Sequence, residues 1–181
     1  MTRKIGVLLG SFRRAAFTRS VADAAIAQLS DNCEASIWAL DELPLFNQDY
    51  DDDGATPPQW AAFREQVAAA DAVLVVTPEY NRSFPAVLKN ALDIASRPAG
   101  ENRWAGKPGA VISVSPGRIG GALANQHIRQ PLAFLGISVL QQPELYISDV
   151  ASLLDADGHL SDERTLRHLK DFITAFEDLI G

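Results

Sequence analysis

Short runs of consecutive apolar residues alternate with longer segments of helical periodicity, and this alternation limits the possible folds of the chain most. The clearest runs are Ile5 to Leu9, followed by Gly10, and Ala72 to Val76, followed by Thr77-Pro78. Strands that are apolar along their whole length are typical of parallel sheets covered by helices on both faces. The pattern therefore predicts an α/β protein with a buried parallel sheet.

Five strand candidates and five helix candidates follow one another. The predicted strands are Ile5–Leu9, Ala35–Leu40, Ala72–Val76, Gly109–Ser115 and a short one at Val139–Leu140. The predicted helices are Ser20–Leu29, a segment opened by Pro57-Pro58 that runs to about Ala70, Pro85–Ser96, Gly121–Leu135 and Ser161–Ile180. We expect a three-layer, doubly wound, five-stranded parallel sheet in the order 2-1-3-4-5. Residues 1–181 are expected to form one domain, because about 150 residues make a domain.

Charge and cysteine content restrict the partners and the compartment. The chain has 16 Lys and Arg against 23 Asp and Glu, a formal net charge of −7, which argues against binding to nucleic acid or to an anionic membrane. The single cysteine permits no internal disulfide, and no apolar run approaches the ~20 residues that a membrane span needs. We therefore expect a cytoplasmic protein with no nucleic-acid or membrane partner.

The loop after the first strand carries the donors that a terminal phosphate requires. Ligands of open α/β sheets bind where strands end at the reversal of winding, here between the first and third strands. The hydroxyls of Ser11 and Thr18, the guanidinium of Arg13 and the N–H groups of the next helix combine hydrogen bonds with positive charge. Alternatively, the two hydroxyls cap the helix, while Arg13 and Arg14 are solvated. The dinucleotide and triphosphate glycine patterns G-x-G-x-x-G and G-x-x-x-x-G-K-[ST] do not occur here.

Two further loops are expected to converge on the same crevice. Thr77 to Ser83 follows the third strand, and its Pro78-Glu79-Tyr80-Asn81 segment places backbone groups and an aromatic ring where a planar ligand would lie. The alternative for this segment is an ordinary tight turn. The loop Ser113 to Gly121 has glycines that either let the backbone approach a ligand or only permit a turn, namely Gly117, Gly120 and Gly121.

The motifs in these loops extend along nearly the whole chain. They are Gly10-Ser11-x-Arg13, Thr77-Pro78-Glu79-Tyr80-Asn81, Ser83-x-Pro85-x-x-Leu88-Lys89-Asn90-Ala91-x-Asp93, Ala105-Gly106-Lys107-Pro108, Gly120-Gly121-Ala122 and Arg129-Gln130. Together they resemble the NADPH-dependent FMN reductase family, and more narrowly its chromate- and quinone-reducing branch. The resemblance implies a flavodoxin-like fold, bound FMN, and NADPH or NADH as co-substrate.

The resemblance also implies which residues hold FMN. The phosphate contacts fall on Ser11, Arg13 and the backbone of Ala16, Phe17 and Thr18. The isoalloxazine ring lies against Pro78, Glu79, Tyr80 and Asn81, with Val114, Ser115 and Gly117 near its far side. Many relatives carry Ser and Asn in place of Ala16 and Thr18, which leaves this site one side-chain donor fewer. No catalytic acid or base is expected, because a flavin carries the chemistry itself.

The expected reaction passes a hydride from NADPH or NADH to FMN, and then two electrons to a small-molecule acceptor such as a quinone, a ferric chelate or chromate. Arg82, Arg97 and Arg118 are candidates for substrate contacts, and the resemblance favours Arg97 as a residue that reaches an active site at a subunit contact. A homodimer or homotetramer is expected from the apolar surface of Pro85–Ser96 together with Trp104, Leu123, Leu132, Phe134 and Leu135.

Two other functions fit such a chain. A flavodoxin-type electron carrier would hold FMN without oxidising NAD(P)H, and a net charge of −7 is compatible with it. A phospho-receiver domain requires an acceptor aspartate at the end of the third strand, where this chain has Thr77-Pro78.

No metal site is expected. Asp49, Asp51 and Asp53 begin like a calcium loop, but Trp60 stands where the bidentate glutamate is needed, so this acidic stretch is predicted to be a solvated, irregular turn. The three histidines show no metal-ligand spacing; they are His127, His159 and His168.

Overall fold

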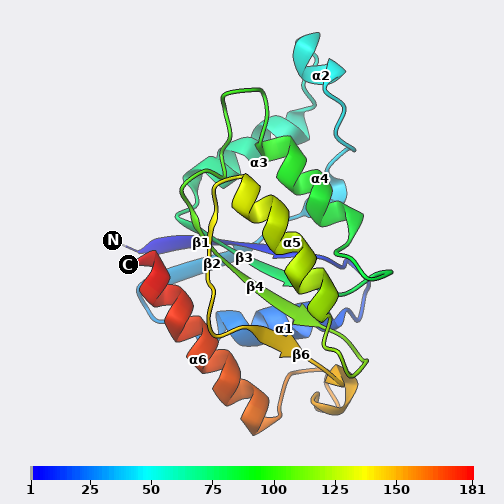
Figure 1. The fold of residues 1–181 in the computed structure, drawn as a ribbon, viewed down its shortest axis with the longest axis vertical. Helices are drawn as coiled ribbons and strands as arrows, with labels where there is room; N and C mark the ends of the chain where they lie inside the picture. The colour runs from blue at the N-terminus through cyan, green and yellow to red at the C-terminus, as the bar shows by residue number, and fades with distance from the viewer. Residues whose placement is uncertain (1) are drawn as a thin grey trace.

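The computed structural model describes residues 2–181, which are built around a twisted parallel sheet (Figure 1). Its strands are β1 (Arg3–Leu9), β2 (Cys33–Ile37), β3 (Ala72–Thr77), β4 (Pro108–Val114), β5 (Ser138–Val139) and β6 (Leu145–Ile147). The strand order is β2-β1-β3-β4-β5, with β6 also paired to β4, and every pair is parallel. The predicted doubly wound, flavodoxin-like order 2-1-3-4-5 is confirmed, with the reversal of winding between β1 and β3.

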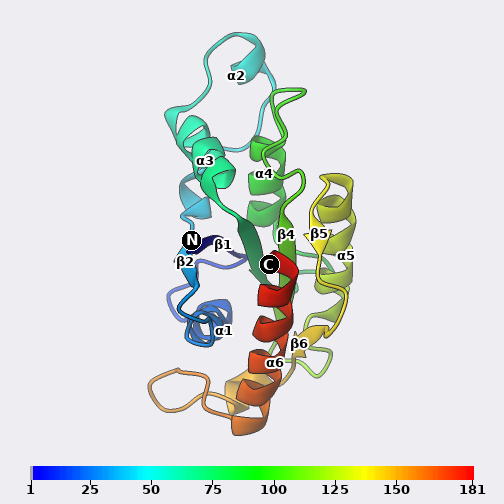
Figure 2. The ribbon, with the colours of Figure 1, turned by 90° about the vertical axis from the view of Figure 1, so that its left-hand side faces the viewer.

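Helices cover both faces of the sheet. They are α1 (Phe17–Ile26), α2 (Asp49–Asp52), α3 (Pro58–Ala69), α4 (Ala86–Ala95), α5 (Ala122–Phe134) and α6 (Glu163–Ile180), with short 3-10 turns η1 (Leu40–Glu42) and η2 (Val150–Ser152). In Figure 1, α3 and α4 lie above the sheet, while α1 and α6 lie below it. The helix α5 packs on the same face as α4, because Ile128 and Leu132 belong to the core cluster that contains Leu88. Figure 2, turned by 90°, shows the same layers from the side. The three-layer architecture is therefore as predicted.

The fifth strand position is occupied by two short strands rather than one. β5 pairs with residues 108–109 at the start of β4, whereas β6 pairs with residues 112–114 at its end. The chain between them passes through Pro143, which has no N–H to donate to a ladder. The prediction of one strand at Val139–Leu140 and its extension therefore located this position but not its division into two strands.

Each face of the sheet has its own core, because successive side chains of a strand point to opposite faces. On one face, Val7 of β1 belongs to the cluster that contains Phe172 and Phe176 of α6. On the other face, the neighbouring Leu8 belongs to the cluster that contains Trp104. A strand buried on both faces must be apolar throughout, which explains the continuous runs in the sequence.

The acidic stretch 49–53, predicted to be a solvated and irregular turn, instead forms the short helix α2 and contains a buried ion pair. The Asp51 side chain, only 7% exposed, accepts hydrogen bonds from Arg64 Nη1 at 2.8 Å and Nη2 at 2.6 Å. The hydroxyl of Thr56 also donates to it, at 2.7 Å. The hydrogen bond from Arg64 is the main reason that the pKa of Asp51 lies below its usual value. Local sequence did not reveal a partner 13 residues away.

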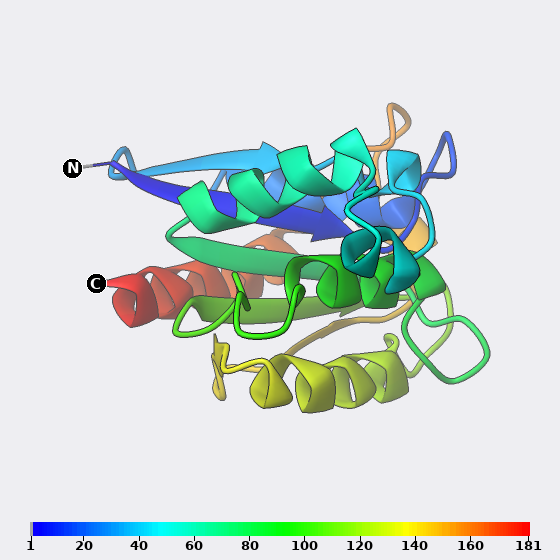
Figure 3. The ribbon, with the colours of Figure 1, turned by 90° about the horizontal axis from the view of Figure 1, so that it is seen from above.

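The start of β1 and the end of α6 lie at the same edge of the sheet (Figure 3), where the Arg3 guanidinium donates to the Gly181 carbonyl at 3.0 and 3.2 Å. The strand arrowheads in Figure 3 point to the opposite edge, so the loops that follow β1, β3 and β4 meet there. None of the helices within residues 2–181 combines the length and the apolar character that crossing a membrane requires.

Candidate active site

A cavity of about 420 Å³ opens at the edge of the sheet where β1, β3 and β4 end. Its walls come from three loops and the first turn of α1, and consist of Ser11, Arg13, Ala16, Phe17, Thr18, Pro78, Glu79, Tyr80, Val114, Ser115 and Pro116. The predicted cofactor residues thus lie together around one cavity, except that Asn81 and Gly117 do not line it. Pro116 is an additional wall residue, which lies between the predicted Ser115 and Gly117.

The first turn of α1 offers unused hydrogen-bond donors to this cavity. The helix follows Ala16, and within residues 2–181 no side-chain hydrogen bond reaches its first N–H groups. Ser11 Oγ bonds to Tyr80 and Thr18 Oγ1 is unpaired in the described part of the chain, so the alternative that these two hydroxyls are helix caps is wrong. Thr18 is 1% exposed, and its Oγ1 has no hydrogen-bond partner within residues 2–181. The N–H groups of Phe17 and Thr18 have no acceptor inside the helix, as at any helix start. A buried polar group without a partner is costly, which points to a ligand that satisfies it.

Arg13 and Ser11 lie beside these donors. The Arg13 guanidinium lies 5.5 Å from the centre of the Phe17 ring and donates to the carbonyl of Ala15 at 2.8 Å. Ser11 Oγ accepts a hydrogen bond from the Tyr80 hydroxyl at 3.1 Å, which links the first loop to the second. This end of the cavity therefore combines a guanidinium, hydroxyls and a helix start, the groups that bind phosphate.

The second loop is a tight turn and a cavity wall at once. Tyr80 and Ser83 exchange backbone hydrogen bonds of 2.9 and 3.0 Å, and the two residues between them, Asn81 and Arg82, have φ values of 52° and 67°. Two consecutive residues with positive φ make a type I′ turn, in which asparagine is common at the first of these positions but arginine is unusual at the second. Gly10 allows this loop to approach the first one closely, because a Cβ at this position would lie only 2.5 Å from Pro78 Cδ.

Two of the three glycines of the third loop, Gly120 and Gly121, pack against the sheet rather than against the cavity. Gly120 and Gly121 have φ values of 62° and 74°, and a Cβ on Gly120 would lie 3.0 Å from the Tyr146 carbonyl carbon. A Cβ on Gly121 would lie 3.1 Å from Ser113 Cβ. For Gly120 and Gly121, a permitted turn is therefore the interpretation that the structure supports.

Glu79 makes contacts that the sequence analysis did not foresee. Its Oε2 accepts hydrogen bonds from the backbone N–H groups of Leu123 at 3.0 Å and Ala124 at 3.2 Å, at the start of α5. The only signal in the sequence is indirect, because Gly121 at the helix start has no side chain that could act as a cap.

None of the three arginines predicted to contact substrate lines the cavity. Arg82 is exposed and pairs with Glu79 at 3.3 Å, and Arg118 is exposed two residues after Pro116. Arg97 follows α4, which connects β3 to β4. A crossover helix returns the chain to the edge where the next parallel strand begins, so Arg97 lies at the edge opposite to the cavity.

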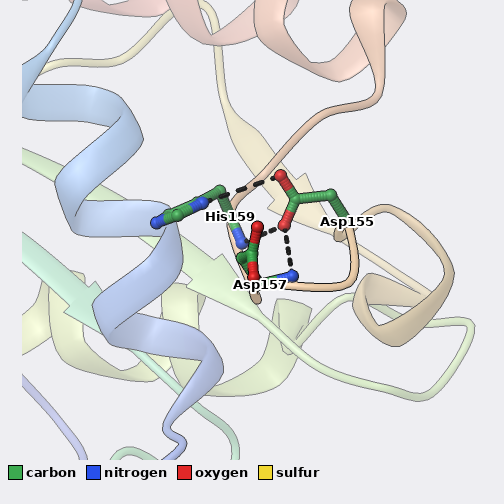
Figure 4. Close-up of side chains that lie close together, drawn as sticks. All are labelled: Asp155, Asp157 and His159. Carbon is green, nitrogen blue, oxygen red and sulfur yellow. Dashed lines mark hydrogen bonds and ion pairs between the residues drawn. The ribbon is translucent and has the colours of Figure 1, made fainter.

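A group of potential metal ligands lies outside the cavity, in the loop before α6. Figure 4 shows Asp155, Asp157 and His159, whose ligand atoms lie within 4.8 Å of one another. Asp155 Oδ1 accepts hydrogen bonds from the N–H groups of His159 at 2.9 Å and Asp157 at 3.0 Å, and these bonds lower the pKa of Asp155, the one from His159 most. The Asp155 carboxylate thus stabilises the exposed turn to which Asp155 belongs. The spacing of the three histidines gave no sign of this group, because its other two members are aspartates.

A family model, relatives of known sequence and solved structures all match this chain, and they indicate the same fold and the same family. Residues 3–152 match the family of NADPH-dependent FMN reductases. The chain is 45% identical over 176 residues to a 2-hydroxy-1,4-benzoquinone reductase of Burkholderia sp, with 97% of this chain and 95% of that protein covered. It is also 45% identical over 174 residues to a quinone reductase of Pseudomonas putida, with 96% and 90% covered.

Among solved structures, the flavoenzyme NAD(P)H:(acceptor) oxidoreductase FerB of Paracoccus denitrificans matches with a TM-score of 0.92 and 37% identity, over 99% of this chain and 97% of that one. The match of residues 3–152 and the identity to full-length relatives therefore establish that this chain belongs to the NADPH-dependent FMN reductase family.

Proposed function

We propose that this protein is an FMN-dependent oxidoreductase that takes electrons from NADPH or NADH and delivers them to quinones. Ferric chelates and chromate are further acceptors to test. The acceptor class is supported by the names of relatives that are 45% identical over nearly their whole length. We also propose that residues 1–181 work as one flavodoxin-like FMN-binding domain.

The observation that carries the proposal is the buried hydroxyl of Thr18, which has no partner within residues 2–181 and lines the cavity. A phosphate would accept hydrogen bonds from this hydroxyl and from the N–H groups of Phe17 and Thr18, while Arg13 balances its charge. Ala16 supplies no side-chain donor, but the uncapped helix start supplies backbone donors at the same place. The residues present therefore fit the phosphate of FMN.

The remaining walls suit a planar ring. Pro78, Glu79 and Tyr80 form one wall, and the segment 114–116 forms another. Tyr80 is 50% exposed and stands at the rim, where an aromatic ring packs readily on a second one. When bound, FMN supplies the redox chemistry, taking two electrons from NAD(P)H and passing them to the acceptor. Asn81 and Gly117 stay candidates for backbone contacts, since each adjoins a wall residue.

Arg82 and Arg118 are proposed to attract the phosphates of NAD(P)H. Both side chains are exposed and lie on loops that also contribute cavity walls. Exposed positive charge near a cleft raises the local concentration of an anionic substrate.

We further propose a homodimer or homotetramer. Three of the apolar residues expected to drive association are buried within the chain itself, namely Trp104, Leu132 and Leu135. Leu123 and Phe134 of α5 stay exposed, at 42% and 89%, and are the surface that association would cover. Assembly would also give Arg97 a role, because it lies at the wrong edge to reach its own cavity and would complete that of a partner. A monomeric mass in light scattering would exclude this arrangement.

The proposed function is tested by an anaerobic visible spectrum of the FMN-reconstituted protein, recorded before and after stoichiometric NADPH, and again with NADH. Rapid bleaching of the bound flavin, followed by recovery on addition of a benzoquinone, is expected. Flavin that binds but does not bleach with either nucleotide would instead identify an electron carrier. Failure to bind flavin would remove the assignment of the cavity.

A further inference from the structure

The start of α5 is capped by a side chain from another loop. Gly121 precedes the helix with φ of 74° and has no side chain to accept a hydrogen bond. A helix start leaves four N–H groups without acceptors in the helix, and Ser, Thr, Asp or Asn at the cap position usually satisfies part of them. Here Glu79 takes this role from 44 residues away, through its bonds to the N–H groups of Leu123 and Ala124.

The Glu79 carboxylate is nearly enclosed, although it belongs to a cavity wall. Its side chain is 11% exposed, and Oε1 accepts a hydrogen bond from Arg82 Nη1 at 3.3 Å. A negative charge therefore lies in the wall of the cavity, and the positive end of α5 together with Arg82 offsets it. Both oxygens are already used within the chain, so they are poor candidates for contacts to a ligand.

A second link joins the same turn to α5. Ser83 Oγ lies 2.9 Å from His127 Nδ1, and the ring of Phe84 meets the His127 ring edge-on at 5.3 Å between centres. The turn from Pro78 to Ser83 is thus fastened to α5 on both sides of Asn81 and Arg82. Residues in rarely adopted backbone conformations persist where their surroundings hold them.

We propose that Glu79 is a positioning residue, which fastens the cavity-wall turn Pro78–Ser83 to the start of α5 and sets the charge that bound FMN experiences. The inference rests on the proposed FMN site and assigns the Glu79 side chain to that site's geometry and electrostatics instead of to a ligand contact. Reduction adds negative charge to a flavin ring, and a nearby carboxylate opposes added negative charge. Glu79 therefore has two separable effects, one on geometry and one on charge.

Two substitutions separate these effects. Glu79→Gln keeps an oxygen that accepts from the α5 N–H groups, while it removes the charge and the second oxygen, which accepts from Arg82. We expect FMN affinity within about twofold of wild type and a more positive midpoint potential of bound FMN. A tenfold gain in the affinity for reduced over oxidised FMN would appear as a shift of about 30 mV for a two-electron couple. Glu79→Ala removes the cap as well, and FMN affinity is expected to fall about tenfold as the wall loosens.

Asp162→Asn is the matched control. Asp162 is the helix-cap carboxylate of α6, accepting from the Thr165 N–H at 2.8 Å, and it lies in the wall of a different cavity. Neither FMN affinity nor potential is expected to change in this variant. Affinity is measured by quenching of flavin fluorescence, and potential by anaerobic reduction beside reference dyes.

Three results would overturn the inference while leaving the proposed function intact. They are wild-type affinity in Glu79→Ala, an unchanged or more negative potential in Glu79→Gln, and effects of equal size in Asp162→Asn. If the wild-type protein does not bind FMN at all, the proposed function fails, and the inference fails with it.

Discussion

Two helix starts face the same edge of the sheet, and the chain uses them in opposite ways. At α1, no side chain caps the helix, and the buried hydroxyl of Thr18 has no partner within residues 2–181. At α5, the Glu79 carboxylate accepts hydrogen bonds from two N–H groups of the first turn, those of Leu123 and Ala124. The two starts have the same intrinsic attraction for an anion. Only the start that the protein leaves unsatisfied remains available to a ligand.

The largest effect is expected at a carboxylate that, like Glu79, is satisfied inside the chain but lies away from the cavity. Asp51→Ala leaves the buried Arg64 without its partner, and breaking such a pair costs about 3–5 kcal/mol of unfolding free energy. FMN affinity of the folded protein should not change, because neither residue lines the cavity. Urea unfolding and flavin titration measure the two quantities, and a loss of FMN affinity in folded protein would contradict this separation.

The Asp51–Arg64 ion pair also predicts how the free energy of unfolding depends on pH. The pKa of Asp51 is lowered in the folded state, so its contribution is fully present above the usual value of 3.8 and is lost as pH falls through the lower folded value. The stability difference between wild type and Asp51→Asn should therefore be constant near neutral pH and shrink below pH 3.8. A difference that stays constant down to pH 2 would contradict the depressed pKa.

The next largest effect is expected on FMN affinity, at the uncapped start of α1. Arg13→Ala should lower FMN affinity by about 1.5–3 kcal/mol, the usual value for a hydrogen bond to a charged group, with little change in apo-protein stability. Arg14→Ala is the matched control, because Arg14 is exposed and does not line the cavity. Equal FMN retention in the two variants would remove Arg13 from the phosphate site.

Thr18→Val should separate stability from binding. The hydroxyl has no partner to lose, so the apo protein should unfold at the same or a higher temperature, while FMN affinity falls about tenfold. Thr165→Val is the control, since the Thr165 hydroxyl donates to Asp162 at 2.7 Å and its loss should lower the unfolding temperature without affecting FMN. A lower unfolding temperature for apo Thr18→Val would show that the hydroxyl is satisfied within the chain.

The smallest effect is expected on the stability of the apo protein, at the start of α5 that Glu79 caps. Glu79→Ala should lower the unfolding free energy of the apo protein by about 1 kcal/mol, the usual cost of losing a helix cap. Thermal unfolding without flavin measures this cost independently of any cofactor. An apo protein as stable as wild type would show that water replaces the carboxylate at the start of α5, and the two helix starts would then no longer differ.

The fold was predictable because it follows from local patterns. A strand such as β3, buried on both faces, has to be apolar at every position, and this signal survives without knowledge of its neighbours. The ends of elements were less predictable. The helix placed at Ser20 begins at Phe17, since the start is set by where Ala16 leaves the extended backbone, and no capping residue marks that point.

The candidate site was predictable as a set of loops but not as a set of contacts. Parallel strands bring their carboxyl ends together, so the loops after β1, β3 and β4 had to meet. The sequence did not reveal which side chains in those loops lack a partner in the folded chain and are therefore available to a ligand. Glu79 was expected at the ring, yet its carboxylate accepts hydrogen bonds from α5. No sequence signal was recognised for the Asp51–Arg64 ion pair or for the group formed by Asp155, Asp157 and His159.

Local patterns in the sequence were enough to predict the alternation of strands and helices, the edge at which a ligand would bind and the residues that could donate to a phosphate there. Each of these follows from periodicity or from neighbours along the chain. The assembled fold alone shows that the donors of α1 stay free and that those of α5 are used by Glu79. A hydrogen bond satisfies a group wherever its partner stands in the chain, so availability to a ligand is settled only when the whole fold is assembled.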